Sequence, residues 1–374
     1  MRAVAVVPSE KKLRLIDLPA PRLERDSDVR VKVLQVGICG TDREVARFEY
    51  GKPPPGERHL VIGHEMLGQV VEVGKRVKHL EPGDLVVTMV RRACGNPRCL
   101  PCSYERPDFC RTGEFTERGI NGRHGFMTEE VVDEERFMCP VPRHIADVGV
   151  LTEPLTIAAK GLIEAVDFLK RLPWLAELGG EEAVAPNRNA LVLGAGPVGL
   201  LGALALRLRG YKTFVYSRED ATSEKAKWVE SIGANYLAGA DVPATALGER
   251  IGNIDLIYEA TGSATLPFVA MTSLGTNGIF IFTGVPGGGK PITIDSQLVM
   301  RNLVLKNQIL YGTVNAGPDA FADAIAELAK YRARWPGAVK ALVTGYCEPE
   351  AAGELILGTP TGIKNVVRFA KLDV

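Results

Sequence analysis

A glycine-rich loop, Gly194-Ala195-Gly196-Pro197-Val198-Gly199, constrains the fold of this 374-residue chain more than any other feature. It lies between the apolar run Leu191-Val192-Leu193 and a second apolar stretch, which is typical of a strand, a tight turn and a helix. Glycine lets the backbone approach a pyrophosphate at the helix N-terminus, where free N–H groups and the helix dipole favour anions. Alone, this glycine pattern also occurs in strand–helix turns that serve packing and bind no nucleotide. Further unpatterned apolar runs at 213–216, 255–258 and 279–282 resemble strands buried on both faces of a parallel sheet, so we predict a doubly wound dinucleotide-binding domain.

The first 150 residues have a different pattern. Residues 29–34 alternate like a strand, 67–74 form another apolar segment with internal glycines, and a Glu-Pro-Gly-Asp turn at 81–84 precedes a third. A length of 374 residues also favours two domains. The expected fold class is therefore α/β, with a β-rich domain formed by residues 1–187 and 311–374 and the dinucleotide-binding domain by residues 188–310.

Charge and composition exclude some classes of function. Forty-five basic residues balance 45 acidic ones, which argues against a general attraction to nucleic acid or to an acidic membrane. The longest apolar stretch contains four glycines and a proline, which is unlike a membrane span. With no secretory signal in the first residues, we expect a cytoplasmic protein whose cysteines bind metal rather than form disulfides.

Four cysteines lie within seventeen residues: Cys94, Cys99, Cys102 and Cys110. Glycine and proline residues between them make the segment 94–110 rich in turns, as a loop wrapped around a metal requires. Four thiolates are the ligand set of structural zinc, which holds a loop together and takes no part in chemistry.

A second zinc pattern is spread more widely. Cys39 lies in Gly37-Ile38-Cys39-Gly40-Thr41-Asp42, and His64 lies in Gly63-His64-Glu65. Neither residue alone indicates a site, since a single histidine is more often structural. Together, at the ends of apolar segments and beside glycines, they suit a catalytic zinc, which keeps three protein ligands and one open position. Two zinc patterns with a dinucleotide loop indicate a zinc-dependent dehydrogenase.

The end of the second strand of the dinucleotide domain selects the cofactor. An acidic residue there would bind the ribose hydroxyls of NAD, whereas this chain has Ser217-Arg218, a hydroxyl followed by a guanidinium suited to phosphate. Glu219 comes next and opposes this interpretation, and Arg218 is alternatively a solvated loop cation. We expect NADP, alone or together with NAD. The loop that begins at Thr283, Gly284 and Val285 follows another strand, at the edge where such sheets bind ligands.

Taken in order, GICGTD, GHE, the four-cysteine lobe, EPGD and GAGPVG resemble the zinc-containing medium-chain dehydrogenase/reductase family over essentially the whole chain. The resemblance implies a GroES-like catalytic domain, a Rossmann domain and an active site between them. It also implies Glu153, in Leu151-Thr152-Glu153-Pro154-Leu155, as a ligand of the catalytic zinc, with Glu65 approaching the metal or supporting it. The family commonly forms dimers or tetramers.

Narrower features resemble the archaeal-type glucose dehydrogenases of that family: Arg91-Arg92, the segment 107–115 and Gly312-Thr313-Val314-Asn315. The resemblance implies that Glu114, Glu153 and Asn315 bind sugar hydroxyls. It further implies that the segment 313–315 and Lys364 contact the cofactor. One departure is the spacing of Cys94 and Cys99, which are separated by four residues where the family usually has two.

These observations together predict the oxidation of an aldose at C1 to the lactone. In such sites zinc lowers the pKa of a hydroxyl. Thr41, two residues after Cys39, would accept the proton, and Glu44 would pass it on, although both are alternatively turn and surface residues. The polar residues implied at the site suit a polyhydroxylated substrate.

Other functions remain as alternatives on the same scaffold. They are a polyol, threonine or general alcohol dehydrogenase, because fold alone does not separate these. From another class, a non-catalytic NADPH-binding protein should have lost zinc ligands, yet Cys39, His64, Glu65 and Glu153 are all present.

Overall fold

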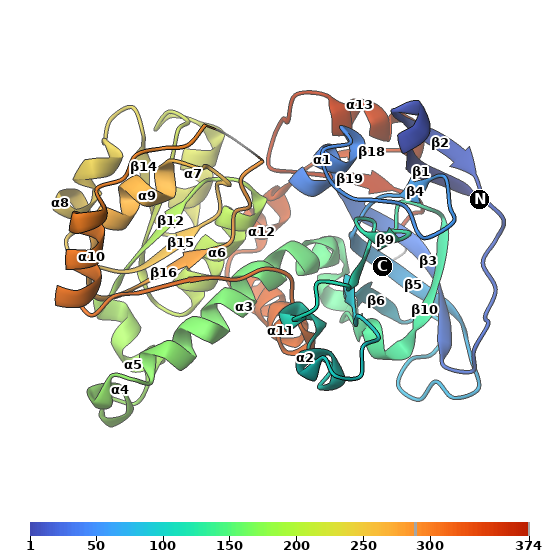
Figure 1. Ribbon diagram of the computed structural model, residues 1–374, viewed down its shortest axis with the longest axis horizontal. Coiled ribbons are helices and arrows are strands. Elements are labelled where there is room, and N and C mark those ends of the chain that lie inside the picture. Colours follow the sequence, from blue (N-terminus) through green and yellow to red (C-terminus); the bar gives the residue numbers. More distant parts are fainter. Residues whose placement is uncertain (288–289, 373–374) are drawn as a thin grey trace. The chain divides into compact units, whose positions relative to one another are not determined.

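The structure is a computed structural model that describes residues 1–287 and 290–372. The chain forms two compact units, Met1–Thr156 with Asn315–Val374, and Ile157–Val314; Figure 1 gives their elements in chain order. The first division lies inside helix α3 (Thr152–Leu169). The sequence-based boundary lay later, at 187/188, so residues 157–187 group with the second unit and not with the first.

The second unit is built on a six-stranded parallel sheet with the order β14-β13-β12-β15-β16-β17. Its strands are β12 (Asn189–Leu193), β13 (Lys212–Ser217), β14 (Asn235–Ala238), β15 (Ile254–Glu259), β16 (Leu274–Phe282) and β17 (Ile309–Gly312). Numbered within the sheet, this order is 3-2-1-4-5-6, the order of a doubly wound dinucleotide-binding fold. The predicted parallel-sheet domain is therefore confirmed. Its switch point lies between β12 and β15, where such folds bind ligands.

Helices connect these strands, and α6 (Pro197–Leu208) follows the glycine loop directly. Pro197 stands in its first turn, where the missing N–H costs nothing, and Leu200 and Leu204 are fully buried. The other helices of the unit are α4 (Pro173–Glu177), α5 (Glu181–Val184), α7 (Glu224–Ser231), α8 (Leu247–Ile251), α9 (Leu266–Ala270) and α10 (Ser296–Leu305). A Cβ atom on Gly199 would lie 2.1 Å from the carbonyl oxygen of Gly194, so only glycine lets α6 start this close to the loop.

The first unit is β-rich, as predicted. Its strands are β1 (Arg2–Val7), β2 (Lys12–Asp17), β3 (Asp28–Gly37), β4 (Leu60–Val61), β5 (Glu65–Val73), β6 (Leu85–Thr88), β7 (Arg91–Arg92), β8 (Thr116–Arg118), β9 (Gly122–Arg123), β10 (Glu130–Glu134), β11 (Met138–Pro140), β18 (Val343–Cys347) and β19 (Lys364–Arg368). The main sheet has the order β11-β6-β5-β3-β19-β18, and β10 also pairs with β3. Alternate residues of β3, among them Val31 and Val33, are fully buried in its core.

The end of the chain returns to this first unit. Strand β19 pairs antiparallel with β3, with Val367 opposite Val36. The helices of the unit are α1 (Gly40–Ala46), α2 (Leu100–Ser103), α11 (Pro318–Arg334), α12 (Pro336–Ala341) and α13 (Ala352–Leu357). Among the described residues, no helix combines the length and the apolar character needed to cross a membrane.

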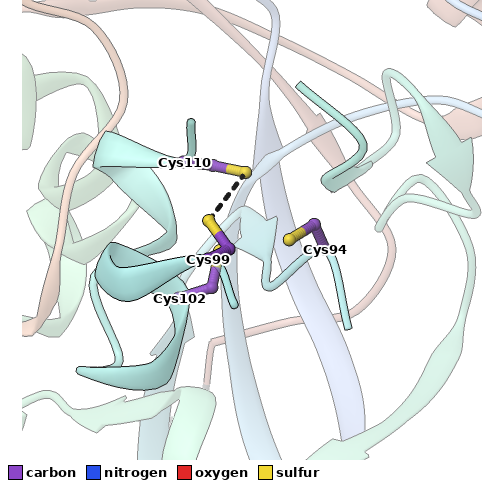
Figure 2. A group of neighbouring side chains, drawn as sticks. All are labelled: Cys94, Cys99, Cys102 and Cys110. Carbon is purple, nitrogen blue, oxygen red and sulfur yellow. Dashed lines mark hydrogen bonds between the residues drawn. The ribbon is translucent and has the colours of Figure 1, made fainter. Parts of the chain in front are cut away.

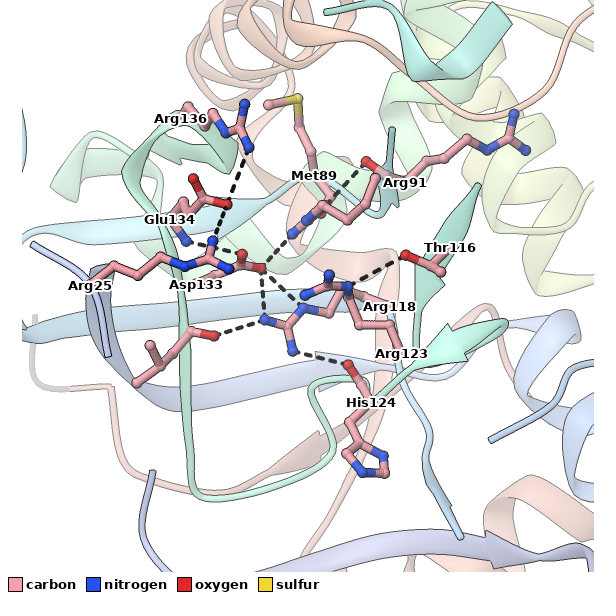
Figure 3. A network of polar contacts seen from close by, with 12 residues as sticks. Arg25, Met89, Arg91, Thr116, Arg118, Arg123, His124, Asp133, Glu134 and Arg136 are labelled. Carbon is pink, nitrogen blue, oxygen red and sulfur yellow. Dashed lines mark hydrogen bonds and ion pairs between the residues drawn. The ribbon is translucent and has the colours of Figure 1, made fainter. Parts of the chain in front are cut away.

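A buried ion cluster joins three strands of the first unit (Figure 3). Asp133 on β10 accepts hydrogen bonds from Arg92 on β7 and from Arg118 on β8, whose Nε and Nη2 lie 3.0 and 2.8 Å from Oδ2. All three side chains are less than a tenth exposed. Burial by itself would raise the pKa of Asp133, but the two guanidinium groups lower it to about 2. The carboxylate therefore stays charged in the folded protein at all ordinary pH values.

We predict that Asp133→Asn lowers the free energy of unfolding by about 3–5 kcal/mol at neutral pH, because it leaves two buried arginines without their anion. A carboxyl group with a lowered pKa stabilises the fold above its unfolded-state pKa and loses that effect as the pH falls toward its folded-state pKa. The difference from the unmodified protein should thus shrink as the pH falls from about 4 toward 2. Urea unfolding measured across this range tests it, with the exposed Asp26→Asn as control. A difference that stays constant with pH would contradict the assignment.

Candidate active site and zinc sites

The register of β3 and β5 brings the second zinc pattern together. Gly37 at the end of β3 lies opposite Glu65 at the start of β5, so the residues just beyond them, Cys39 and His64, become neighbours. The ligand atoms of Cys39, His64 and Glu65 all lie within 4.8 Å of one another. Thiolate, imidazole and carboxylate are the ligands that zinc prefers, and three of them leave the open position that chemistry needs.

A buried carboxylate, Asp42 in the first turn of α1, organises these ligands. It accepts hydrogen bonds from the backbone N–H of Cys39 (2.9 Å) and of Gly63 (3.1 Å). Its Oδ1 also lies 3.4 Å from Nδ1 of His64, an atom that is buried and makes no well-formed hydrogen bond. Burial alone would lower the pKa of His64, but the Asp42 carboxylate raises it well above its usual value. A carboxylate behind a histidine is the usual support of a zinc ligand.

Glu65 is held from the opposite side by Lys364 on β19. The Nζ atom of Lys364 lies 2.7 and 2.6 Å from the two carboxylate oxygens of Glu65 and 3.2 Å from the carbonyl of Ile38. Both side chains are 1% exposed. The sequence predicted that Lys364 contacts the cofactor; the structure gives it a different partner, and the cofactor contact stays a prediction.

Glu153, in the first turn of α3, is electrostatically coupled to the same group. Its carboxylate makes no hydrogen bond with the described residues, in contrast to that of Glu65. Burial raises the pKa of Glu153 to about 7; His64 and Lys364 oppose this shift, and Glu65 adds to it. Glu153 is thus a carboxylate without a partner, beside the cluster that contains Cys39.

The predicted proton path is only partly visible. The Oγ1 atom of Thr41 lies 3.9 Å from Sγ of Cys39, and Thr41 is partly exposed. Glu44 lies one turn further along α1, also partly exposed, and its backbone carbonyl accepts N–H groups of the next turn. The structure thus brings Thr41 to Cys39, and the side chain of Glu44 makes no hydrogen bond or ion pair with the described residues.

The four cysteines of the lobe converge (Figure 2). Their sulfur atoms all lie within 4.8 Å of one another, and Cys99 and Cys110 are 3.9 Å apart. Tetrahedral zinc with Zn–S bonds of about 2.3 Å would place its sulfurs about 3.8 Å apart. Backbone N–H groups of Arg111 and Cys102 lower the pKa of Cys99 to about 6, whereas burial raises the pKa of the neighbouring Cys102. The four residues between Cys94 and Cys99 are accommodated by a loop with Gly95 in the left-handed region (φ 73°).

Asn315, which is predicted to contact the substrate and the cofactor, is held in place by two successive polar contacts. Its Nδ2 donates to Glu117 at 3.1 Å, and Glu117 is paired with Arg91 at 3.0 Å. Arg91 also stacks on Phe115, 3.7 Å from the ring centre. Glu114, next to that ring, is exposed. Arg91 and Glu117 therefore position two of the predicted sugar-binding segments, a role that the sequence pattern did not reveal for Glu117.

The predicted cofactor residues of the second unit lie at one edge of its sheet. Residues 194–199 follow β12, Ser217 ends β13 and Arg218 follows it, residues 283–285 follow β16, and Thr313 and Val314 follow β17. These are carboxyl ends of parallel strands, where doubly wound folds bind nucleotides. The glycine loop has the expected form, with Gly194 at φ 103° and Gly196 at the N-cap of α6.

The charges around Ser217 bear on the cofactor. Arg218 is exposed and makes no ion pair with any described residue. The carboxylate of Glu219, which opposed an NADP site in the sequence, accepts a hydrogen bond from Ser217 Oγ and lies 2.6 Å from Nζ of Lys225 on α7. Lys225 thus compensates the charge of Glu219.

Sequence reasoning missed Glu259, the last residue of β15. Its carboxylate is 1% exposed and accepts four hydrogen bonds, from the N–H and hydroxyl of Thr261 and from the N–H groups of Gly262 and Gly284. It therefore fixes the loops after β15 and β16 at the switch point. A single glutamate at a strand end gives no sequence signal, because the contact that links the two loops, with the N–H of Gly284, spans 25 residues.

Comparisons with known proteins agree with this geometry. Residues 146–369 match the family described as glucose dehydrogenase C-terminus, and residues 25–143 match the alcohol dehydrogenase GroES-like domain. A glucose 1-dehydrogenase of Methanocella arvoryzae is 36% identical over 370 residues, with 99% of each chain covered. That of Thermoproteus tenax is 37% identical, with 98% of this chain and 99% of the relative covered.

A solved structure is also similar over its whole length. It is Haloferax mediterranei glucose dehydrogenase in complex with NADP, Zn and gluconolactone, 31% identical, with all of both chains covered and a TM-score of 0.88. The GroES-like part of the predicted fold class is confirmed by these matches. The chain belongs to the zinc-dependent medium-chain dehydrogenase family, in the group of the glucose 1-dehydrogenases.

Proposed function

We propose that this protein is a zinc-dependent, NADP-linked glucose 1-dehydrogenase that oxidises C1 of glucose to gluconolactone. The observation that carries the proposal is full-length similarity to glucose 1-dehydrogenases together with an intact cluster of Cys39, His64 and Glu65. A chain that kept only the fold would have no reason to keep these three side chains, or Asp42 beside Cys39 and His64. The expected homo-oligomeric state, dimer or tetramer, stays a prediction.

The proposed catalytic zinc ligands are Cys39, His64 and Glu153. The free carboxylate of Glu153 supports it over Glu65, whose two oxygens are both engaged by Lys364. Cys94, Cys99, Cys102 and Cys110 are the proposed structural zinc ligands. When bound, the catalytic zinc supplies a Lewis acid that lowers the pKa of a substrate hydroxyl, and the nicotinamide supplies the hydride acceptor.

The chain's own groups would handle the proton and the sugar. Thr41 Oγ1, beside Cys39, accepts the proton of the C1 hydroxyl and passes it outward, with Glu44 as the next group in the proposed relay. Glu114 and Asn315 bind the remaining hydroxyls. The chain of Arg91, Glu117 and Asn315 supports this role, because it keeps the amide of Asn315 in one orientation.

The proposed cofactor site is the carboxyl edge of the parallel sheet. The residues proposed there include the glycine loop 194–199, residues 283–285 and the segment 313–315. The free guanidinium of Arg218 supports binding of a 2′-phosphate, and the pairing of Glu219 with Lys225 supports it further by reducing repulsion. NAD would bind the same edge with the ribose hydroxyls facing Ser217.

The activity itself can be tested directly. Purified protein is assayed for NADP reduction with D-glucose, D-galactose, D-xylose, sorbitol, threonine and ethanol. We expect turnover on aldoses, loss of turnover with a chelator, and no turnover in Cys39→Ala, which should still bind NADPH because its nucleotide edge is untouched. Zinc content should fall from about two ions per chain to about one in that variant.

The control for this experiment is Cys347→Ala, a free cysteine outside both clusters, which should keep activity and zinc. Activity on polyols or alcohols, with none on aldoses, would keep the zinc mechanism but show that the substrate belongs to another class. A fully active Cys39→Ala enzyme would refute the zinc site.

Cofactor choice gives a second prediction. Arg218→Ala should raise the KM for NADP about tenfold or more and leave the KM for NAD nearly unchanged, because the lost guanidinium binds only the phosphate. Lys225→Ala should act in the same direction, since it exposes the charge of Glu219 to the phosphate. Lys227→Ala, an exposed lysine on the same helix paired with Glu224, is the matched control. Equal effects of Arg218→Ala on both cofactors would remove Arg218 from the phosphate site.

A further inference from the structure

A buried negative charge lies at the nucleotide edge of the parallel sheet. The side chain of Glu259, at the end of β15, is 1% exposed. Its Oε1 atom accepts the N–H of Thr261 at 2.6 Å, the hydroxyl of Thr261 at 2.5 Å and the N–H of Gly262 at 3.2 Å. Its Oε2 atom accepts the N–H of Gly284 at 3.0 Å. Both oxygens act only as acceptors, which is the pattern of an ionised carboxylate.

The charge of this carboxylate is not neutralised by a cation. All its donors among the described residues are uncharged N–H and O–H groups. Such bonds stabilise an anion but leave its net charge in place. A buried lysine of α3, Lys160, also reaches this edge, where its Nζ donates to the carbonyl of Val314 at 3.1 Å. Val314 follows β17, which is two strands away from β15 in the sheet.

The loops around Glu259 contain no charged side chain. The segments that follow β12, β15, β16 and β17 are residues 194–199, 260–265, 283–287 and 313–314, and none of them contains Asp, Glu, Lys or Arg. The strand ends that precede these loops are also uncharged apart from Glu259. Because Glu259 is buried, its field is screened by water and salt much less than that of a surface charge.

Glu259 lies directly beneath two of these loops. Strands β15 and β16 are neighbours in the sheet (Figure 1), and the carboxylate binds the loops that follow both. A Cβ atom on Gly284 would lie 2.4 Å from the backbone nitrogen of Gly262 and 2.7 Å from Oε2 of Glu259. The two loops are therefore in contact with each other and with the carboxylate.

The sheet order indicates which half of a dinucleotide would meet this charge. A doubly wound fold binds a dinucleotide across its two halves. In the proposed cofactor site Arg218, which follows β13, binds the 2′-phosphate of the adenosine half. The half of the sheet formed by β15, β16 and β17 then receives the nicotinamide. The nicotinamide ring of NADP⁺ is positively charged, whereas that of NADPH is neutral, so a buried carboxylate attracts only the ring of the oxidised form.

We propose that Glu259 makes the cofactor site selective for NADP⁺ over NADPH, because it places an unneutralised negative charge beneath the loops that receive the nicotinamide. This inference rests on the proposed cofactor site. In the oxidation of an aldose, NADP⁺ is the form that must bind and NADPH the form that must leave. Glu259 thus favours loading of the oxidised cofactor and release of the reduced one. It is a positioning residue that acts through its field and through the two loops.

Cofactor binding in the absence of a sugar tests the proposal. The full-length, zinc-loaded protein is titrated by calorimetry with NADP⁺ and, separately, with NADPH. Glu259→Gln removes the charge, so the Kd for NADP⁺ should rise about tenfold and that for NADPH should rise much less. The amide of the new side chain faces the N–H of Gly284, which weakens that contact. Glu259→Ser, a second neutral variant with room for water at the freed N–H groups, should show the same selective loss.

Two further variants separate the charge from the fixing of the loops. Glu259→Asp keeps the charge but is too short to reach all the donors, so its affinities for NADP⁺ and NADPH should fall by similar factors. Thr261→Val removes one hydroxyl donor, and the ratio of the two affinities should again stay as in the unmodified protein. Glu249→Gln, a change at an exposed carboxylate of α8, is the matched control and should alter neither affinity.

A probe without nicotinamide locates the effect. The 2′-phosphate of ADP-ribose should bind the unmodified protein, Glu259→Gln and Glu259→Ser with equal affinity. Equal losses of NADP⁺ and NADPH affinity in the two neutral variants would overturn the proposal and leave Glu259 only as a support of the loops. An unchanged ratio of affinities in either neutral variant would also contradict it. An unmodified protein that binds neither NADP⁺ nor NADPH would instead refute the proposed cofactor site itself.

Discussion

The active site depends on the buried carboxylate of Asp42. This group joins two segments that lie apart in the sequence: it accepts hydrogen bonds from the backbone N–H of Cys39, just after β3, and of Gly63, just before β5, and its Oδ1 lies 3.4 Å from Nδ1 of His64. Removing a carboxylate of this kind would leave two buried N–H groups without acceptors and the imidazole free to turn. The positions of Cys39 and His64, two of the proposed zinc ligands, therefore depend on one side chain that is not itself a proposed ligand.

A similar arrangement recurs at the nucleotide edge. Glu259 ties the loops after β15 and β16 together through three backbone N–H groups, as Asp42 ties the loops around the zinc ligands. In each case a buried anion is satisfied by backbone donors and not by a lysine or arginine. Such hydrogen bonds to a charged acceptor are stronger than neutral ones, and they hold loops rigid where chemistry needs fixed geometry.

Much of the fold could be predicted from sequence because its signals are local. The glycine loop, the apolar runs of β12, β13, β15 and β16, and the four closely spaced cysteines each depend on neighbouring residues. Strands β14 and β17 escaped prediction because they are short and lie at the edges of the sheet, where burial on one side gives a weak pattern. No feature of the sequence indicates that the boundary between the two units falls within α3.

The candidate site was predictable only in part, because the residues that hold its side chains in place are distant from them in the sequence. Lys364 meets Glu65 across 299 residues, and Asn315 meets Glu117 across 198. No spacing rule connects such pairs. For the same reason the sequence left both Glu65 and Glu153 as possible third ligands of the catalytic zinc. In the structure Lys364 pairs with Glu65, whereas the carboxylate of Glu153 makes no hydrogen bond with the described residues.

The most direct test of this account is the zinc affinity of Asp42→Asn, measured by competition with a chelator. The substitution keeps the size of the side chain and removes its charge, so the catalytic zinc should bind about 10–100-fold more weakly. The zinc of the four-cysteine lobe and the binding of NADPH should not change. Affinity equal to that of the unmodified protein would contradict the central role given to Asp42.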